Sequence, residues 1–408
     1  MAQQQSTSQN ESIPAVQLAD GGLSSDTEVM TTAGPVSVEH LSLNDEVYTL
    51  DLSTGITKCK PVTDISRVET DQIVRLQGKR FDFSLAPDHR VPYRTKAVLP
   101  TQVTSAVKLS TQRYYKFVNE WQVIQRQKLE TADVTEYADD YQICAETDLH
   151  GNTFRAALPD SCRPVQRNRD IGYSFDAETF EQYREEIESV AIETGIREGK
   201  NQRRQPFRFD GDDFVEFLGW FVTEGNVYWS KQRRTASVQI AQKTEKYRTQ
   251  IKALLERMGF VVRTRPNGFR FGSYFYGQLL TDLCGKDSHS KRLPDLVWSL
   301  SCDQKQLLLD TLIDGDGNEH GVYYTASEEL AGDVLRLCIE LGHKPRYTIR
   351  RGVYQIFIKE VNDGFDSTIH LTTVEANTEL YQLTVEDFPI VMAGRHGKFQ
   401  WVGVSSVS

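Results

Sequence analysis

Two different hydrophobic patterns run along this chain. Residues 217–225 and 309–317 are apolar runs that each end in an acidic residue followed by glycine. Acidic residues suited to N-capping precede both runs, namely Asp212, Asp213 and Asp303, so we expect two buried helices that end at a carboxylate. Near the N-terminus, apolar and polar residues alternate between Gly, Pro, Asn and Asp breaks, which predicts short antiparallel strands. These predicted strands are 26–30, 35–38, 46–51 and 73–76.

The two apolar runs are suited to pack against each other. Small residues at the third position of each run, Gly219 and Thr311, would let the backbones approach closely and bring the C-terminal ends side by side. Glu224 and Asp316 would then meet. Two adjacent carboxylates repel each other unless a divalent cation lies between them, and oxygen ligands favour Mg²⁺. Such a site suits phosphodiester hydrolysis.

The two runs resemble the paired motifs of LAGLIDADG homing endonucleases, with Glu224 and Asp316 at the eighth position, which that family uses to hold metal. They lie 316 − 224 = 92 residues apart. Either run alone would more often be an ordinary buried helix, but two at this spacing favour an active site. The resemblance implies an α+β domain of two αββαββα repeats. It also implies a monomer that binds Mg²⁺, or Mn²⁺ in its place, and cuts a long double-stranded DNA site.

The segments that follow each run fit such a repeat. Apolar residues recur at helical spacing in three segments and at strand spacing in seven. The predicted helices are 245–258, 276–283 and 328–341. The predicted strands are 226–229, 237–240, 261–265, 269–271, 322–324, 345–349 and 353–358.

Several basic and amide side chains on these elements are candidates for contact with nucleic acid. Alternate side chains of a saddle-shaped sheet can reach the major groove, although each one alone is as readily an ordinary surface residue. Lys291 belongs to a Lys-Arg-x-Pro segment that resembles the block supplying an active-site lysine, which would stabilise charge in the transition state. Lys359 is the corresponding candidate for the second half. The DNA-contact candidates are Arg233, Arg234, Gln239, Gln242, Lys243, Arg263, Arg270, Arg346 and Arg350.

The two chain ends carry a second resemblance. Residues 23–27 and 83–91, together with 381–394 and 398–405, resemble the first and last blocks of an intein, whose splicing domain is the all-β Hint domain. The resemblance implies that both ends form one Hint-like domain, which encloses the endonuclease.

Residues needed for splicing are missing. Splicing needs a first nucleophile and a terminal Asn, yet Gly22 stands at the position of the first Cys, and Gly403 and Val404 stand where the family has His-Asn. Pro389 replaces an assisting His. Ala86 replaces the Thr of a Thr-x-x-His motif, which leaves His89, expected here to be structural, and Ser405 at the downstream nucleophile position. We expect a splicing-incompetent protein.

Composition fits a multidomain protein. The 408 residues exceed a single usual core. No apolar run approaches 18 residues and no CxxC spacing occurs, so we expect a cytoplasmic, DNA-associated protein with six reduced cysteines and no membrane span. The predicted parts are a disordered segment 1–21, Hint-like halves 22–111 and 376–408, a linker or accessory DNA-contacting region 112–210, and repeats 211–300 and 301–375.

The net charge of −10 hides an uneven distribution. Residues 201–300 contain 17 Lys and Arg against 10 Asp and Glu, a local surplus of +7. Such a basic region is the footprint expected for phosphate contact. A broken basic series ahead of it is equally an exposed surface or a DNA-contacting arm. That series is Arg163, Arg167, Arg169, Arg197, Lys200, Arg203, Arg204 and Arg208.

We therefore interpret the chain as a site-specific, Mg²⁺-dependent DNA endonuclease. A non-cleaving, sequence-specific DNA-binding regulator on the same scaffold is the alternative from another class, although binding alone gains nothing from buried acids. An active intein is the third interpretation, and the missing Asn argues against it.

Overall fold

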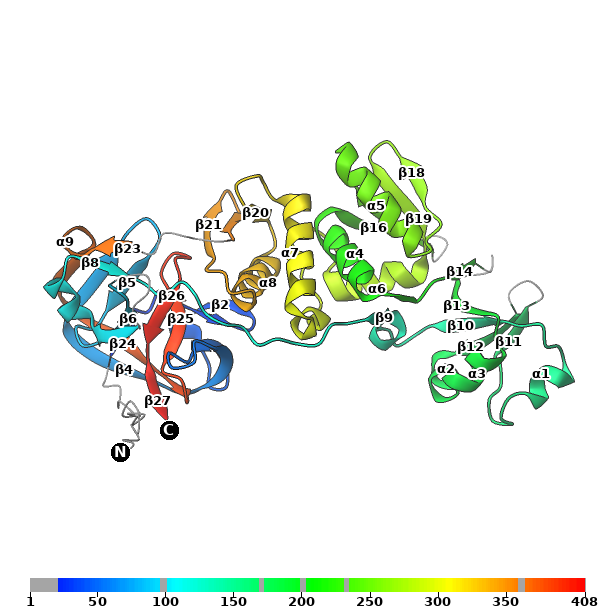
Figure 1. Ribbon diagram of the computed structural model, residues 1–408, viewed down its shortest axis with the longest axis horizontal. Helices are drawn as coiled ribbons and strands as arrows, with labels where there is room; N and C mark the ends of the chain where they lie inside the picture. The colour runs from blue at the N-terminus through cyan, green and yellow to red at the C-terminus, as the bar shows by residue number, and fades with distance from the viewer. Residues whose placement is uncertain are drawn as a thin grey trace, which may run out of the picture. The chain divides into compact units, whose positions relative to one another are not determined.

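The computed structural model describes residues 21–95, 101–168, 172–198, 203–230, 235–358 and 364–407. The chain forms two compact units, one from residues 1–122 and 361–408 and the other from 123–360 (Figure 1). The two chain ends thus share a unit. Residues 112–122 and 361–375 belong to it, which corrects the predicted boundaries at 111 and 376.

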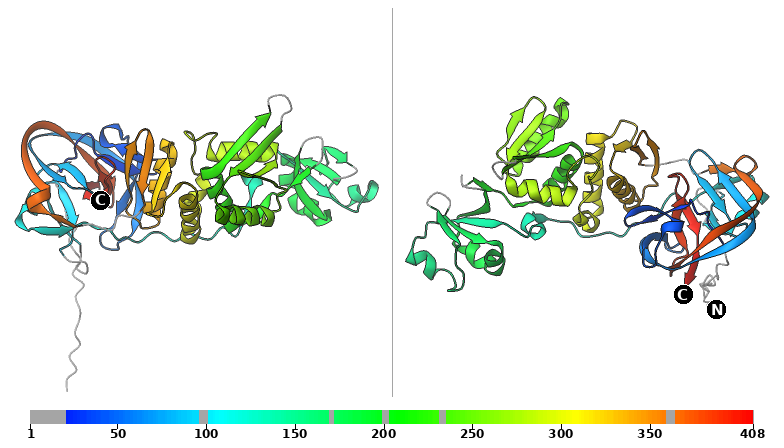
Figure 2. Two further views of the ribbon diagram at one scale, coloured as in Figure 1. Left: turned by 90° about the horizontal axis from the view of Figure 1, so that it is seen from above. Right: turned by 180° about the vertical axis from the view of Figure 1, so that it is seen from behind.

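The unit made by the chain ends is rich in sheet, as predicted. Its longest strands, β4 (Thr57–Gln77) and β24 (Leu371–Glu386), pair antiparallel from Leu371 opposite Leu76 to Val385 opposite Val62 (Figure 2). Val29, Phe83, Tyr381 and Val391, which come from both ends of the sequence, share one apolar core. The nine-stranded sheet also contains β1 (Glu28–Thr31), β2 (Gly34–Ser37), β3 (Glu46–Leu50), β5 (Asp82–Leu85), β25 (Ile390–Gly394), β26 (Gln400–Gly403) and β27 (Ser405–Val407).

Residues 131–205 form a folded module within the second unit, where an accessory region or linker was expected. Its antiparallel sheet has the order β11-β12-β10-β13-β14. Residues 177–198 form two short helices followed by a strand, and Tyr183, between the two helices, leaves the helical conformation. The elements are β9 (Thr131–Asp133), β10 (Gln142–Glu146), α1 (Asn152–Ala156), β11 (Gln166–Asn168), β12 (Gly172–Asp176), α2 (Ala177–Gln182), α3 (Arg184–Val190), β13 (Glu193–Glu198) and β14 (Arg203–Gln205).

The first repeat has the expected order of elements. Its leading helix, α4 (Gly211–Glu224), is capped by Asp210, whose carboxylate accepts the backbone N–H groups of Asp212 and Asp213. The cap therefore lies two residues before the predicted one. The other elements are β16 (Gly225–Ser230), β17 (Thr235–Ala241), α5 (Glu245–Arg257), β18 (Arg263–Arg265), β19 (Gly268–Gly272) and α6 (Tyr274–Cys284).

The second repeat is shorter than the predicted αββαββα order. Its leading helix, α7 (Cys302–Asp316), is capped by Ser301 rather than Asp303. Residues 318–321 form a tight turn, with the Gly321 N–H donating to the Asn318 carbonyl oxygen, so the first strand is reduced to a bridge between Gly317 and Tyr323. The sheet in this described part is three-stranded. It contains β20 (Val322–Thr325), β21 (Arg346–Arg350) and β22 (Val353–Phe357), and α8 (Glu328–Glu340) packs on it.

Among the described residues, no helix has the length and apolarity that a membrane crossing requires.

Candidate active site

The centre of the site is the contact between α4 and α7. A Cβ placed on Gly219 would lie 2.8 Å from Cβ and Cγ2 of Thr311, and one placed on Gly315 would lie 2.3 Å from Oγ1 of Thr223. These pairs occupy the third and seventh positions of the two motifs, so each helix contributes one glycine and one threonine. The small residues allow the close approach of the backbones that the sequence predicted.

Both helices end directly after their carboxylates. The N–H of Gly225 donates to the Phe221 carbonyl oxygen, and the N–H of Gly317 donates to the Ile313 carbonyl oxygen. A Cβ at Gly225 or Gly317 would lie only 2.3 or 2.5 Å from that same oxygen. Glycine is therefore required for the chain to turn away at the acidic residue.

Asp316 lies close enough to Glu224 for its charge to affect the protonation of Glu224. Burial, together with the charge of Asp316, raises the pKa of Glu224 to about 7. Burial raises the pKa of Asp316 to about 6, and the charge of Lys291 opposes this rise. Two partly buried carboxylates with raised pKa values form a site that a cation would stabilise.

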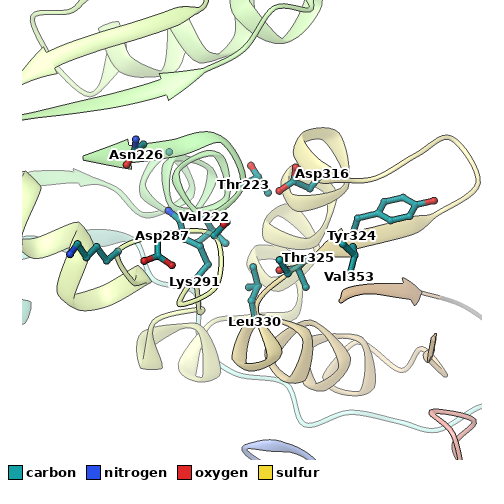
Figure 3. A pocket seen from close by; sticks show the side chains of 14 residues that line it. Val222, Thr223, Asn226, Asp287, Lys291, Asp316, Tyr324, Thr325, Leu330 and Val353 are labelled. Carbon is teal, nitrogen blue, oxygen red and sulfur yellow. The ribbon is translucent and has the colours of Figure 1, made fainter. Parts of the chain in front are cut away.

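Each carboxylate opens into a cavity that is lined by residues of both repeats. Asp316 lines a cavity of about 490 Å³ together with Thr223 and Asn226, which belong to the first repeat (Figure 3). Glu224 lines a second cavity of about 590 Å³ with Asp314 and residues of the turn that follows α7. Residues of both repeats line each cavity because the C-terminal ends of α4 and α7 pack side by side.

Lys291 lies in the cavity of Asp316 (Figure 3). Its Nζ donates to the Phe221 carbonyl oxygen at 2.8 Å and lies 3.9 Å from the centre of the Phe221 ring. Burial lowers its pKa to about 8. Its own carbonyl oxygen accepts the Ser327 hydroxyl, which caps α8, so the lysine is anchored from both repeats.

Gln242 has a position that the sequence did not predict. It was expected to contact DNA, but the side chain is buried and its Nε2 donates to Oε1 of Glu224 at 3.0 Å. Its Oε1 accepts the N–H groups of Lys243 and Thr244, which fixes the amide. The only sequence signal was its place just before α5.

Two carboxylates alone are a sparse ligand set. No cluster of three or more His, Cys, Asp or Glu suited to a metal occurs in the part of the chain that the structure describes. The carbonyl and carboxylate oxygens present suit Mg²⁺, with the remaining positions left to water or phosphate oxygens.

Polar side chains form a row across the four-stranded sheet of the first repeat. Asn226 pairs opposite Gln239, Gln239 opposite Arg270, and Arg270 opposite Arg263. The neighbours of Gln239 in β17, Val238 and Ile240, are buried, so this row lies on the opposite face. Asn226 was missed because the sequence alone gave no strand register.

The other residues that were predicted to contact DNA do not lie together in one row. Lys243 is exposed, Arg350 is exposed at the end of β21, and Arg346 is partly exposed with its guanidinium 3.6 Å from the centre of the Phe357 ring. In the upstream basic series, Arg204 pairs with Glu193 and Glu146, and Arg208 pairs with Asp133 and Glu188. Arg169, Lys200, Arg233, Arg234 and Lys359 lie outside the described residues.

The N-terminal splicing position is closely packed. A Cβ at Gly22 would lie 2.5 Å from Cβ of Leu380, and one at Gly21 would lie 2.7 Å from Nδ1 of His89. His89 is buried, neither ring nitrogen has a hydrogen-bond partner among the described residues, and burial lowers its pKa to about 4. The histidine therefore stays neutral.

The C-terminal splicing positions are also enclosed. A Cβ at Gly403 would lie 2.6 Å from the Arg90 carbonyl oxygen. Val404 is buried and donates its N–H to the Pro389 carbonyl oxygen, while Ser405 pairs with Thr384 in the sheet. This geometry leaves no room for a larger residue at Gly403.

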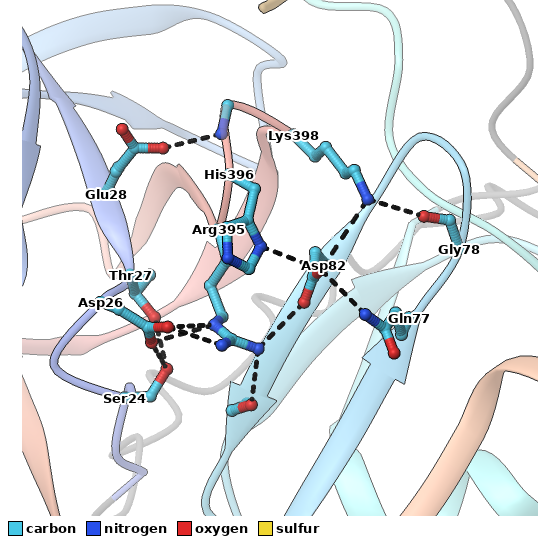
Figure 4. Close-up of polar contacts among 12 residues, drawn as sticks. Ser24, Asp26, Thr27, Glu28, Gln77, Gly78, Asp82, Arg395, His396 and Lys398 are labelled. Atoms are coloured by element: carbon cyan, nitrogen blue, oxygen red, sulfur yellow. Dashed lines mark hydrogen bonds and ion pairs between the residues drawn. The ribbon is translucent and has the colours of Figure 1, made fainter. Parts of the chain in front are cut away.

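Ion pairs around the buried Asp82 connect the N-terminal and C-terminal segments of this unit. Asp82, which is 2% exposed as a side chain, accepts Nη1 of Arg395 at 3.1 Å. Arg395 also donates to Asp26 beside the first splicing block (Figure 4). Lys398 and His396 lie near the same Asp82 carboxylate.

Comparison with known proteins identifies the central domain. Residues 211–288 match the family model described as LAGLIDADG-like domain. The chain is 27% identical over 168 residues to a DNA polymerase of Thermococcus sp. (strain GE8), covering 39% of this chain and 10% of the polymerase. It is 26% identical over 175 residues to the DNA polymerase of Thermococcus hydrothermalis, covering 41% and 10%. The chain thus spans about a tenth of the length of these curated relatives.

Solved structures similar to this chain include an AceL NrdHF class 3 split intein and a bacterial intein-like domain from Clostridium thermocellum. The first is 21% identical and covers 32% of this chain and 69% of that chain, with a TM-score of 0.21. The second is 23% identical and covers 25% and 67%, also with a TM-score of 0.21. The resemblance to LAGLIDADG endonucleases that the paired motifs predicted is confirmed by the family match.

Proposed function

We propose that this protein, whose residues 211–288 form a LAGLIDADG-like domain, is a divalent-metal-dependent endonuclease that cuts a long double-stranded DNA site. The observation that carries the proposal is the meeting of Glu224 and Asp316 at the ends of two closely packed helices, beside a sheet with a polar outer row. We propose further that the protein acts as a monomer and that the unit made by the chain ends no longer splices.

The residues of the site have separate tasks. Glu224 and Asp316 would hold Mg²⁺ or Mn²⁺ together with oxygens of the DNA backbone. A bound metal of this kind supplies an activated water and stabilises the leaving oxygen. Gln242 would keep the Glu224 carboxylate in place, and Lys291 would stabilise negative charge at the phosphate. The row containing Gln239, Arg263 and Arg270 would face the bases.

The test is cleavage of a supercoiled plasmid that carries the genomic site from which the coding sequence of this protein has been removed. With Mg²⁺, the wild-type protein should linearise the plasmid, and Asp316→Asn should not. Glu224→Gln should also fail to linearise it. Binding without any product by the wild-type protein would favour the non-cleaving regulator, and a ligated product from a reporter fusion would favour an active intein.

A further inference from the structure

The folded module at residues 131–205 has a charge opposite to that of the sheet on which DNA would lie. It contains 16 Asp and Glu against nine Arg and Lys, a formal charge of −7. Residues 225–272 form the four-stranded sheet of the first repeat and helix α5. They contain 11 Lys and Arg against two Asp and Glu, a charge of +9. Within the unit of residues 123–360, negative charge is therefore concentrated in the module and positive charge in the sheet and α5 of the first repeat.

Half of the 16 acidic side chains of the module are exposed, have no ion pair among the described residues, and are free to act on their surroundings. Asp133 and Glu188 are used in ion pairs with Arg208. A larger group is exposed and has no ion pair within the described ranges. That group is Glu136, Asp139, Asp140, Asp148, Asp160, Glu178, Glu185 and Glu186.

The module is attached directly to the end of the DNA-facing sheet. Glu198 accepts the backbone N–H of Tyr274 at 3.0 Å and that of Phe275 at 3.2 Å, and it also accepts the Ser273 hydroxyl. It therefore caps α6 from outside the helix. Gln205 donates to the Gly272 carbonyl oxygen, and Tyr276 donates to the Pro206 carbonyl oxygen.

The attachment lies close to the basic row. Ser273 follows Arg270 by three residues, and an extended chain rises about 3.3 Å per residue, so the two are about 10 Å apart. Asp139 and Asp140 line a cavity at this junction with Tyr274 and Asp282 of α6. The Debye length is about 10 Å at 0.1 M salt, so these carboxylates would repel a duplex lying on the row.

We infer that the 131–205 module does not bind DNA but acts as an electrostatic boundary, which repels the duplex at the α6 end of the sheet and keeps it on the saddle. This inference rests on the proposed function. It replaces the DNA-contacting arm, because Arg204, one of the basic residues expected in that arm, is held by Glu146 and Glu193. The boundary weakens binding to any duplex that extends past β19.

The test compares two variants of the full chain that lose the same number of charges. One carries Asp139→Asn, Asp140→Asn, Glu185→Gln and Glu186→Gln. The control carries four changes at exposed carboxylates of the chain-end unit, namely Asp64→Asn, Glu69→Gln, Asp71→Asn and Glu375→Gln. Fluorescence anisotropy with a random 30-base-pair duplex in EDTA, at about 50 and 300 mM salt, gives the dissociation constants.

The boundary predicts that the module variant binds the duplex at least about threefold more tightly than the control at low salt, with the difference nearly lost at high salt because screening shortens the repulsion. Equal tightening in both variants would mean that only net charge matters, and weaker binding by the module variant would mean that the module contacts DNA. Either result overturns the inference. If neither variant nor the wild-type protein shows salt-dependent binding, the proposed function is overturned as well.

Discussion

Gly219 lies against Thr311 so closely that a Cβ on the glycine would come within 2.8 Å of the threonine side chain. Gly219→Val would therefore overpack the interface of α4 and α7 and lower the free energy of unfolding by about 1–3 kcal/mol. Gly219→Ala combined with Thr311→Gly should recover part of the loss, because glycine removes the Cβ that the new side chain would meet. Urea unfolding measures both, and the cleavage rate should fall with Gly219→Val because the two carboxylates are displaced.

A matched control exists at another glycine of the same repeat. A Cβ at Gly272 would have its nearest neighbour at 4.0 Å, so Gly272→Val should change stability by less than about 0.5 kcal/mol. Equal destabilisation by the two valines would show that the close contact at Thr311 is not the cause.

Protonation of the carboxylate pair links stability and metal affinity to pH. The folded-state pKa of Glu224, about 7, and that of Asp316, about 6, lie above ordinary values of 4.5 and 3.8. The folded protein therefore binds more protons than the unfolded chain between about pH 4 and 7, and its stability falls as pH rises through that window. Above pH 7 this contribution is constant.

A divalent cation must displace those protons, so Mg²⁺ should raise the melting temperature more at about pH 8 than at about pH 5.5. Differential scanning fluorimetry with and without Mg²⁺ measures the difference. Glu224→Gln with Asp316→Asn should abolish both the Mg²⁺ effect and its pH dependence. A Mg²⁺ effect that survives in this double variant would place the metal elsewhere.

Removal of Lys291 should affect cleavage far more than DNA binding. Its Nζ contacts the Phe221 carbonyl oxygen within the Asp316 cavity, and loss of one such charge-stabilising group typically costs about 10²-fold in rate. Lys291→Ala should thus nick or cut slowly while it binds with near wild-type affinity. Because the pKa of Lys291 is lowered to about 8, the wild-type rate should also decline above that pH as the ammonium loses its proton.

Lys286 lines the same cavity but is exposed, so Lys286→Ala is the matched control for Lys291→Ala. A similar loss of rate in both variants would assign the effect to general positive charge rather than to the buried ammonium. The comparison uses single-turnover cleavage, which separates chemistry from product release.

Much of this architecture could be predicted because it depends on local patterns. The apolar runs ending at Glu224 and Asp316 are helices with those ends, and both require the glycine that follows. The positions of the strands in the first repeat followed from the alternation of apolar and polar residues. The exposed row that includes Asn226 depends on register, which single strands do not specify.

Other features depended on tertiary contacts that no local pattern reveals. Gln242 was expected on the surface, yet the end of α4 brings Glu224 within hydrogen-bond distance of it. The basic residues before 210 were equally an exposed surface or a DNA-contacting arm by sequence, and acidic partners distant in sequence bind two of them.

Restoring the missing splicing residues should not restore splicing. Cβ atoms at Gly22 and Gly403 would lie 2.5 Å from Leu380 and 2.6 Å from the Arg90 backbone oxygen, so Gly22→Cys, Gly403→His and Val404→Asn together would overpack both sites. We expect no ligated product from a reporter fusion and a lower melting temperature. Western blotting for spliced and cleaved products, with a thermal melt of the same variant, measures the two outcomes.

The neighbouring side chains decide whether steric exclusion is the cause. Leu380 is a side chain that can be shortened, whereas the Arg90 carbonyl oxygen belongs to the backbone and cannot be removed. Adding Leu380→Gly, which removes the Cβ that a side chain at position 22 would meet, to Gly22→Cys should therefore relieve the N-terminal site and permit cleavage there by an added thiol, because neutral His89 lies beside Gly21. The C-terminal site should stay inactive in every combination. Ligated product from the three substitutions alone would show that the enclosed geometry does not prevent splicing.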